Sequence, residues 1–153
     1  MNIIETLNKL NIKLPNPPAP VGGYLAYKKI NNLVFVSGQL PIESNGKLIK
    51  GKIGLDLSIE DGKKASYLCA INILSQIKAA SEGDLSRVKN CIKITGFVNS
   101  TDSFTEQPKI INPASELLSK VFGDSGKHAR AAVSVNSLPL GAAVEIDAIF
   151  DIK

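Results

Sequence analysis

Hydrophobic and polar positions divide the chain into stretches of helical spacing and stretches of strand-like spacing. Within residues 1–14, Ile3, Ile4, Leu7 and Leu10 recur at helical spacing, which predicts a short amphipathic helix. The stretch "PNPPAPVGG" ends that helix, because proline lacks an amide donor and fixes its own φ angle. We therefore expect residues 1–20 to form an N-terminal helix and a proline-rich lead-in.

An extended pattern begins at Tyr24. It comprises "YLAYKK" and "NNLVFVSGQLP", with Asn31 and Asn32 between the two apolar runs. Two asparagines between alternating runs are typical of a tight hairpin turn. The first two strands are therefore predicted to form a hairpin, and Asn45 with Gly46 marks a further turn after it.

The clearest helix follows Ser58. Asp61 stands three residues later, the spacing of a capping box, in which each side chain accepts a hydrogen bond from the other residue's amide. Apolar residues then recur at helical spacing as far as Gly83: Ala65, Leu68, Cys69, Ile73, Ile77 and Ala80. This stripe predicts a helix that covers one face of a sheet.

A strand and a second helix are predicted next. Val88, Ile92, Ile94 and Val98 indicate a strand whose alternate residues are buried on one face. The apolar spacing of "KIINPASELLSKVFG" indicates a helix that stops at Gly123. Pro113 predicts a kink in that helix or a late start.

Two strands are expected at the end of the chain, in "RAAVSVNSLP" and "AAVEIDAIFDI". In the last strand Val144, Ile146, Ala148, Phe150 and Ile152 share one face, and Glu145, Asp147 and Asp151 share the other. The order of elements predicts one α+β domain over residues 1–153, with two main helices on one face of a mixed, mostly antiparallel sheet. The uncovered face would suit contact with another subunit.

Composition narrows the class of protein. Apolar residues make up 44% and charged residues 21%, as in ordinary globular domains, and no apolar run approaches the roughly 20 residues that span a bilayer. The net charge of +4 comes from lysines spread along the chain, so we expect neither a nucleic-acid groove nor a membrane partner. Cys69 and Cys91 are isolated, and no secretory leader pattern is present, which favours buried free thiols and a cytoplasmic protein.

Common catalytic signatures are missing. The sequence contains no P-loop, no G-x-G-x-x-G, no H-E-x-x-H, no G-x-S-x-G and no C-x-x-C pair. Its single histidine, His128, falls in the polar stretch "GDSGKH" and is expected on the surface. We therefore expect no metal and no organic cofactor.

Arg130 stands out because the chain has two arginines and sixteen lysines. Arginine is preferred where a planar carboxylate must be held by two parallel hydrogen bonds. Alternatively, Arg130 simply pairs with Glu145 or a surface carboxylate. Glu145 has its own alternative, an outward-facing strand residue that serves solubility.

Two segments carry longer motifs. Ser37, Gly38, Gln39 and Pro41 form an S-G-Q-x-P element, and Tyr24 precedes it. An R-x-x-V-x-V-x-x-L-P-x-x-x-x-[IV]-E-[IV] element runs from Arg130 to Ile146. These two segments resemble the YjgF/UK114 family, also called the Rid family of reactive-intermediate deaminases. The resemblance covers roughly residues 20–152, and the N-terminal helix is similar to that of a longer bacterial-type branch, often labelled endoribonuclease L-PSP.

The resemblance implies a chorismate-mutase-like fold, a homotrimer and a cleft between subunits. Arg130 is similar to the arginine that grips the substrate carboxylate, and Glu145 to the acid that positions or activates water. Tyr24, Ser37, Gly38, Asn112 and Ala132 would line the same cleft. Asn112 could equally cap a helix start, and Tyr24 could equally pack in an interface.

Three functions are consistent with these residues. The first is hydrolysis of 2-imino acids, or their enamine tautomers, to 2-keto acids and ammonia by a cytoplasmic homotrimer. The second is a trimeric protein that binds small carboxylates without turning them over. The third is an endoribonuclease or translation inhibitor, for which one histidine and dispersed lysines offer little chemistry.

Overall fold

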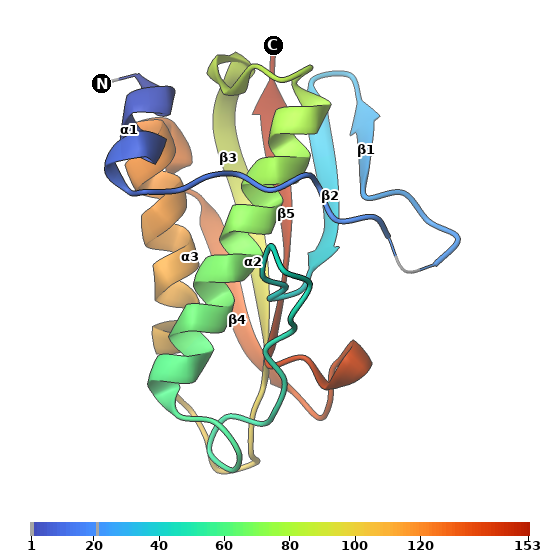
Figure 1. Ribbon diagram of the computed structural model, residues 1–153, viewed down its shortest axis with the longest axis vertical. Helices are drawn as coiled ribbons and strands as arrows, with labels where there is room; N and C mark the ends of the chain where they lie inside the picture. The colour runs from blue at the N-terminus through green and yellow to red at the C-terminus, as the bar shows by residue number, and fades with distance from the viewer. Residues whose placement is uncertain (1, 21) are drawn as a thin grey trace.

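A two-layer arrangement of one sheet and two long helices dominates the computed structural model, which describes residues 2–20 and 22–153 (Figure 1). Met1, at the start of the predicted N-terminal helix, and Val21, within the stretch "PNPPAPVGG", lie outside the described residues. The elements are α1 (Ile3–Lys9), β1 (Tyr27–Ile30), β2 (Leu33–Gln39), α2 (Ile59–Ala80), β3 (Val88–Asn99), α3 (Gln107–Phe122), β4 (Ala129–Val135) and β5 (Val144–Ile152), with short 3-10 turns at Leu85–Arg87, Gly123–Gly126 and Pro139–Gly141.

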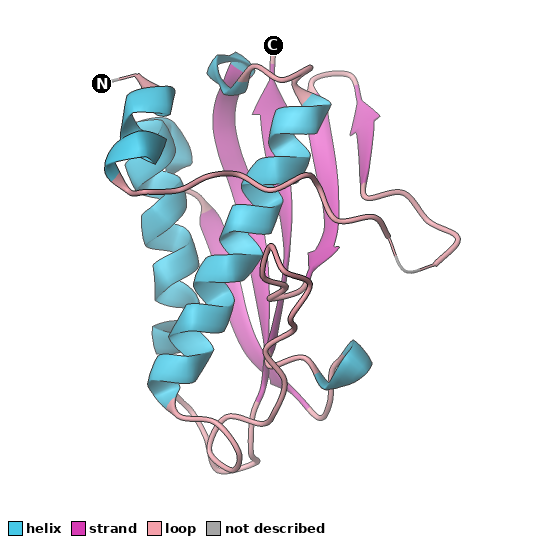
Figure 2. Cartoon of the chain, in the orientation of Figure 1, coloured by secondary structure: helices cyan, strands magenta, loops and turns pink. Residues whose placement is uncertain are grey.

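The sheet has the strand order β1-β2-β5-β3-β4, and its pairs are antiparallel except for β3 with β4. Helices α2 and α3 lie side by side on one face, and Figure 2 shows no helix across the other face. The mixed α+β architecture predicted from the order of elements is confirmed. The face away from the helices is called the open face below.

Local signals set the helix boundaries much as predicted. The Ser58 hydroxyl accepts from the Asp61 amide at 3.1 Å, and the Asp61 carboxylate accepts from the Ser58 amide at 2.9 Å. Helix α3 begins at Gln107 and continues through Pro113, so the predicted late start is wrong. It ends where Gly123 adopts a φ of 63°, which glycine tolerates without strain.

The hairpin of β1 and β2 also forms as predicted, with Asn31 at a φ of 51° in its turn. Its first strand begins at Tyr27, however, so Tyr24 lies in the loop ahead of it. The prediction for Ile92 is wrong, because the pairing of β3 with β5 shifts between Cys91 and Lys93. That irregularity puts Cys91 in the core and leaves Ile92 41% exposed.

The core lies between the sheet and the two long helices. Its largest fully buried side chains include Ile73 and Ile77 of α2, Ile111 of α3 and Phe150 of β5. Cys69 and Cys91 are buried free thiols, and burial raises the pKa of Cys91 to about 12. Neither cysteine is therefore a nucleophile at neutral pH.

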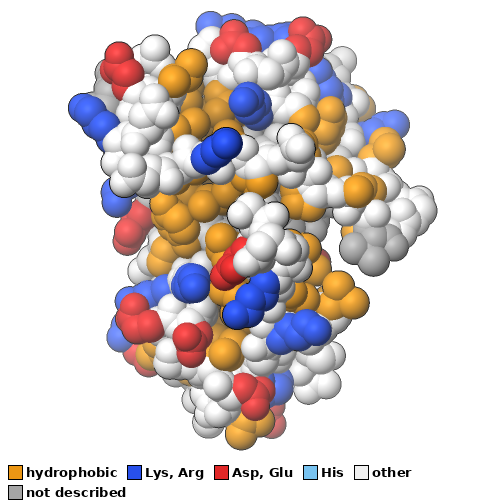
Figure 3. Space-filling view, in the orientation of Figure 1, with side chains coloured by type: hydrophobic (Ala, Val, Ile, Leu, Met, Phe, Trp, Pro, Cys, Tyr) orange, Lys and Arg blue, Asp and Glu red, His pale blue; other side chains and the backbone are white. Residues whose placement is uncertain are grey.

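The helix-covered side shows lysine and arginine side chains scattered among acidic and apolar ones (Figure 3). No dense basic block is visible on that face. No helix among the described residues is long and apolar enough to cross a bilayer.

Candidate functional site

Glu145 lies on the open face because β5 alternates strictly between the core and the open side. Its neighbours Val144 and Ile146 are fully buried in the core. Gly38 of β2 lies directly against the Glu145 side chain, since a Cβ atom at Gly38 would stand 2.7 Å from the Glu145 carboxyl carbon. The glycine therefore leaves the space into which the Glu145 side chain folds.

A hollow of about 160 Å³ lies beside this carboxyl group. Its walls come from Tyr24, from Ser37 and Gly38 of β2, from the segment at residues 18–20 and from the loop at Pro139 and Leu140. The walls are mostly apolar, and Glu145 is the one charged side chain among the described residues that line them. Because pockets for drug-sized ligands are roughly 300–1,000 Å³, this hollow suits only a small molecule.

The environment of Glu145 makes ionisation of its carboxyl group less favourable than it is in water. Burial raises the pKa of this carboxyl group, and the negative charge of Asp147 on the same face raises it further. No donor among the described residues forms a hydrogen bond with the Glu145 carboxylate, so its oxygens can accept hydrogen bonds from a ligand or water. Glu145 is therefore suited to accept and return a proton.

The proline-rich segment next to the hollow is anchored from α2. The Gln76 amide nitrogen donates to the Pro18 carbonyl oxygen at 2.9 Å and to the Gln39 side-chain oxygen at 3.4 Å. Gln39 in turn donates to the Ser37 carbonyl oxygen at 2.9 Å. One buried glutamine thus fixes both the segment at residues 18–20 and the end of β2, which together form walls of the hollow.

Sequence reasoning did not identify Gln76, nor Asn72 one turn before it. Asn72 donates to the carbonyl oxygens of Leu40 and Ile42 at 2.9 and 3.2 Å. Both side chains are buried within the apolar stripe of α2. Two amide side chains four residues apart on a predicted core face are a signal that could have pointed to this anchoring role.

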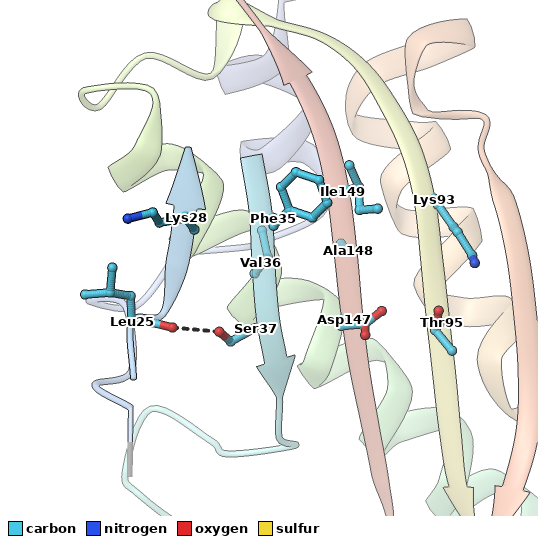
Figure 4. A pocket seen from close by; sticks show the side chains of 10 residues that line it. All are labelled: Leu25, Lys28, Phe35, Val36, Ser37, Lys93, Thr95, Asp147, Ala148 and Ile149. Atoms are coloured by element: carbon cyan, nitrogen blue, oxygen red, sulfur yellow. Dashed lines mark hydrogen bonds between the residues drawn. The ribbon is translucent and has the colours of Figure 1, made fainter. Parts of the chain in front are cut away.

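Ser37 points away from the helices, toward the open face (Figure 4). Its hydroxyl donates to the Leu25 carbonyl oxygen at 2.6 Å and so ties the segment ahead of β1 to β2. Beside it, Asp147 of β5 and Thr95 of β3 border a second depression of about 540 Å³ on the same face (Figure 4).

Arg130 lies on the other side of the sheet. It pairs with Ile94, whose side chain faces the core, and its Nη1 donates to Asn112 Oδ1 at 2.9 Å and to Ser115 Oγ at 3.3 Å. Asn112 lies inside α3, whose N-cap is Glu106, so the alternative that Asn112 caps a helix start is wrong. Ala132, opposite Gly96, shares this face and packs against the core.

No carboxylate among the described residues forms an ion pair with Arg130. The alternative in which Arg130 simply pairs with Glu145 or a surface carboxylate is therefore wrong. His128 also differs from expectation, because it is only partly exposed. Its ring nitrogens lie 2.9 Å from Ser115 Oγ and 2.6 Å from the Gly126 carbonyl oxygen.

The predicted site residues thus form two groups that one chain does not bring together. Tyr24, Ser37, Gly38 and Glu145 surround the hollow, whereas Asn112, Arg130 and Ala132 lie at the β4 edge. Strand β3 separates β4 from β5, and Arg130 and Glu145 lie on opposite faces of the sheet. No metal-binding cluster of acidic, cysteine and histidine side chains is found in residues 2–20 and 22–153.

The chain is similar to known proteins of one family. A family model described as "YjgF/chorismate_mutase-like, putative endoribonuclease" matches residues 5–150. Protein TCP17 of Trypanosoma cruzi is 44% identical over 152 residues, which cover 99% of this chain and 94% of that protein.

Two solved structures share the fold over nearly the whole chain. The protein Atu1372 of Agrobacterium tumefaciens, described as of unknown function, is 46% identical with a TM-score of 0.91, covering 99% of this chain and 94% of that one. A structure described as a "putative endoribonuclease" from Shewanella oneidensis MR-1 is 30% identical with a TM-score of 0.94, covering 99% and 100%.

Proposed function

Because the chain belongs to the YjgF/chorismate mutase-like family, we propose that it hydrolyses 2-imino acids to 2-keto acids and ammonia at a site shared by two copies of the chain. The observation that carries the proposal is the placement of Glu145, a carboxyl group of raised pKa beside a small, mostly apolar hollow. None of the described residues that line the hollow is a cation that could bind a substrate carboxylate. The cation is supplied by Arg130 of a neighbouring copy.

A homotrimer is the assembly we propose. Strand β4, which carries Arg130, is an edge of the sheet, and the open face exposes apolar side chains such as Phe35 and Val133, 43% and 44% exposed. Apolar side chains on an uncovered sheet favour contact with another subunit. A closed ring of three copies presents the β4 edge of each copy to the hollow of the next.

In this mechanism the guanidinium of Arg130 binds the substrate carboxylate through two parallel hydrogen bonds. The imine carbon then lies near Glu145, and the imine side chain occupies the apolar hollow. Tyr24, Ser37, Gly38, Asn112 and Ala132 line the shared cleft. The modest volume of the hollow favours substrates with short, apolar side chains.

Hydrolysis requires one water and no further reactant. The substrate is the N-protonated imine. The ionised Glu145 carboxylate takes a proton from water as the water oxygen bonds to the imine carbon, giving a neutral carbinolamine. Glu145 returns that proton to the nitrogen and the C–N bond breaks. As ammonia leaves, the carboxylate takes the hydroxyl proton, the keto group forms, and the proton passes to ammonia, which departs as ammonium. A raised pKa brings Glu145 closer to the ideal for this shuttle at neutral pH.

The test generates imines in the assay with an amino-acid oxidase, in the presence of a carbonyl-trapping reagent. The measured quantity is the rate at which the imine available to this reagent disappears. Wild-type protein is expected to shorten imine lifetime, and Arg130→Ala to raise KM by roughly 10- to 100-fold. Glu145→Gln should lower kcat by about 10²- to 10⁴-fold. Hydrolysis by Arg130→Ala at the wild-type rate contradicts the proposal.

A carboxylate-binding protein without turnover is the second candidate, because the same Arg130 would serve it. Tight binding of 2-ketobutyrate in calorimetry, with no rate gain over buffer, would favour this function. The endoribonuclease of the family description is the third. It requires RNA cleavage that survives repurification and disappears in Arg130→Ala.

We also propose a cytoplasmic location. Two buried free cysteines that form no disulfide are consistent with a reducing compartment.

A further inference from the structure

The guanidinium of Arg130 is held through one nitrogen. Nη1 makes both of its hydrogen bonds, to Asn112 and Ser115. Within residues 2–20 and 22–153, no hydrogen bond engages Nε or Nη2. The edge formed by Nε and Nη2 therefore keeps the paired donors that fit a carboxylate.

The contacts of His128 fix which ring nitrogen carries the proton. Nδ1 lies 2.6 Å from the Gly126 carbonyl oxygen, and a carbonyl can only accept, so Nδ1 must donate. In the neutral ring Nε2 then has a lone pair, 2.9 Å from Ser115 Oγ. The Ser115 hydroxyl consequently donates its proton to His128.

This donation determines what Ser115 offers to Arg130. With its proton directed at His128, the Ser115 oxygen presents its lone pairs and accepts from Nη1 of Arg130. The hydrogen bonds therefore run in one direction, from Arg130 to Ser115, from Ser115 to His128 and from His128 to the Gly126 carbonyl.

The far end of this chain of hydrogen bonds is rigid. Gly126 is buried against α3, and a Cβ atom there would stand 2.2 Å from the Leu118 carbonyl oxygen. Ser115 and Asn112 lie three residues apart on α3, so both oxygens face β4. The groups that orient Arg130 are therefore side chains of α3 and, through His128, the backbone carbonyl of Gly126, and none of them belongs to an unrestrained loop.

We propose that Ser115 and His128 are positioning residues that turn the Nε–Nη2 edge of Arg130 outward for a substrate carboxylate. The identity of that ligand rests on the proposed function, whereas the hydrogen-bond chain does not. Without Ser115, only Asn112 restrains the guanidinium. Carboxylate binding then weakens while proton transfer at Glu145 is untouched.

Two arginines and one histidine make the chain of hydrogen bonds accessible to NMR with residue-type labelling. We expect His128 of the wild-type protein to carry its proton on Nδ1. Rotation of the Arg130 guanidinium should be slow and should accelerate in Ser115→Ala. Arg87, bonded to Glu82 and to the Lys153 carbonyl, serves as the internal control and should not change.

Conservative variants separate positioning from folding. Ser115→Thr keeps the hydroxyl and should restore slow rotation of Arg130. His128→Gln places an acceptor near the position of Nε2 and should also preserve slow rotation of Arg130. The shorter side chain of His128→Asn does not reach Ser115, so rotation of Arg130 should accelerate in that variant. Equal thermal melting of the two His128 variants checks that both fold.

The kinetic counterpart is a split between KM and kcat. Ser115→Ala should raise KM for small 2-imino acids by about 5- to 10-fold, the effect of one hydrogen bond, and leave kcat unchanged. A proton on Nε2 of His128, or Arg130 rotation that is equal in Ser115→Ala and wild type, overturns the proposal. If the NMR results hold but no imine is hydrolysed, the proposed function fails and the positioning role stands.

Discussion

Gly38 and Glu145 lie in contact, and a Cβ atom at position 38 would come within 2.7 Å of the Glu145 carboxyl carbon. Real Cβ atoms do not approach other atoms so closely, so any side chain at position 38 must displace the carboxyl group. Glycine at position 38 therefore leaves the Glu145 carboxyl group in its observed place beside the hollow.

Gly38→Ala should consequently displace Glu145 and lower kcat for imine hydrolysis, by about 10²-fold if the displacement approaches 1 Å. Gly23→Ala is the matched control, because a Cβ there meets no atom within 4 Å. Comparable kcat values for the two variants would show that the position of Glu145 is not critical.

Glu145→Gln should stabilise the fold at neutral pH. The folded-state pKa of Glu145 is raised, so ionisation is less favourable in the folded protein than in the unfolded chain, and stability is lost as pH rises through the folded pKa. The variant should melt above wild type at neutral pH. The difference should vanish below the ordinary pKa of glutamate.

Asp147→Asn tests the second cause of the raised pKa. Removing the neighbouring negative charge should lower the pKa of Glu145, though not to its ordinary value, because burial is the larger cause. The acidic limb of the pH–rate profile of kcat should move toward lower pH. If the acidic limb does not move, the charge of Asp147 does not influence the pKa of Glu145.

Gln76→Leu should release the segment at residues 18–20 and enlarge the hollow. We expect a loss of about 1–3 kcal/mol in the free energy of unfolding, because the Pro18 carbonyl and Gln39 lose their donor. Activity on imines with bulkier side chains should rise relative to small ones. Gln107→Leu is the control. It removes a donor to the Phe104 carbonyl oxygen, and neither residue lines the hollow, so it should cost stability without that change in preference.

Strand alternation and helical spacing in the sequence predict the fold and the half of the site that contains Glu145. The period of β5 correctly placed Glu145 opposite the core, and the capping box at Ser58 correctly placed the start of α2. Ile92 was misplaced because register shifts in β3 depend on strand pairing, which a single strand's pattern does not encode.

The other half of the site depends on tertiary packing. His128 reads as a surface residue in "GDSGKH", yet the turn between α3 and β4 brings it against Ser115. The contacts of Arg130 require α3 to lie over β4. Each contact joins a residue of α3 to a residue of β4 across the intervening turn, so neither helical nor strand periodicity predicts it. The resemblance nominated Arg130 and Asn112, but it nominated neither Ser115 nor His128 as a partner in the site.

The most direct measurement of a shared site is complementation between two inactive variants. Arg130→Ala and Glu145→Gln are assayed separately and after co-refolding at equal amounts. In a ring of copies, each site takes its arginine and its glutamate from different chains, so random mixing restores about one quarter of the wild-type activity. A mixture as inactive as its components contradicts a site built from Arg130 of one copy and Glu145 of another.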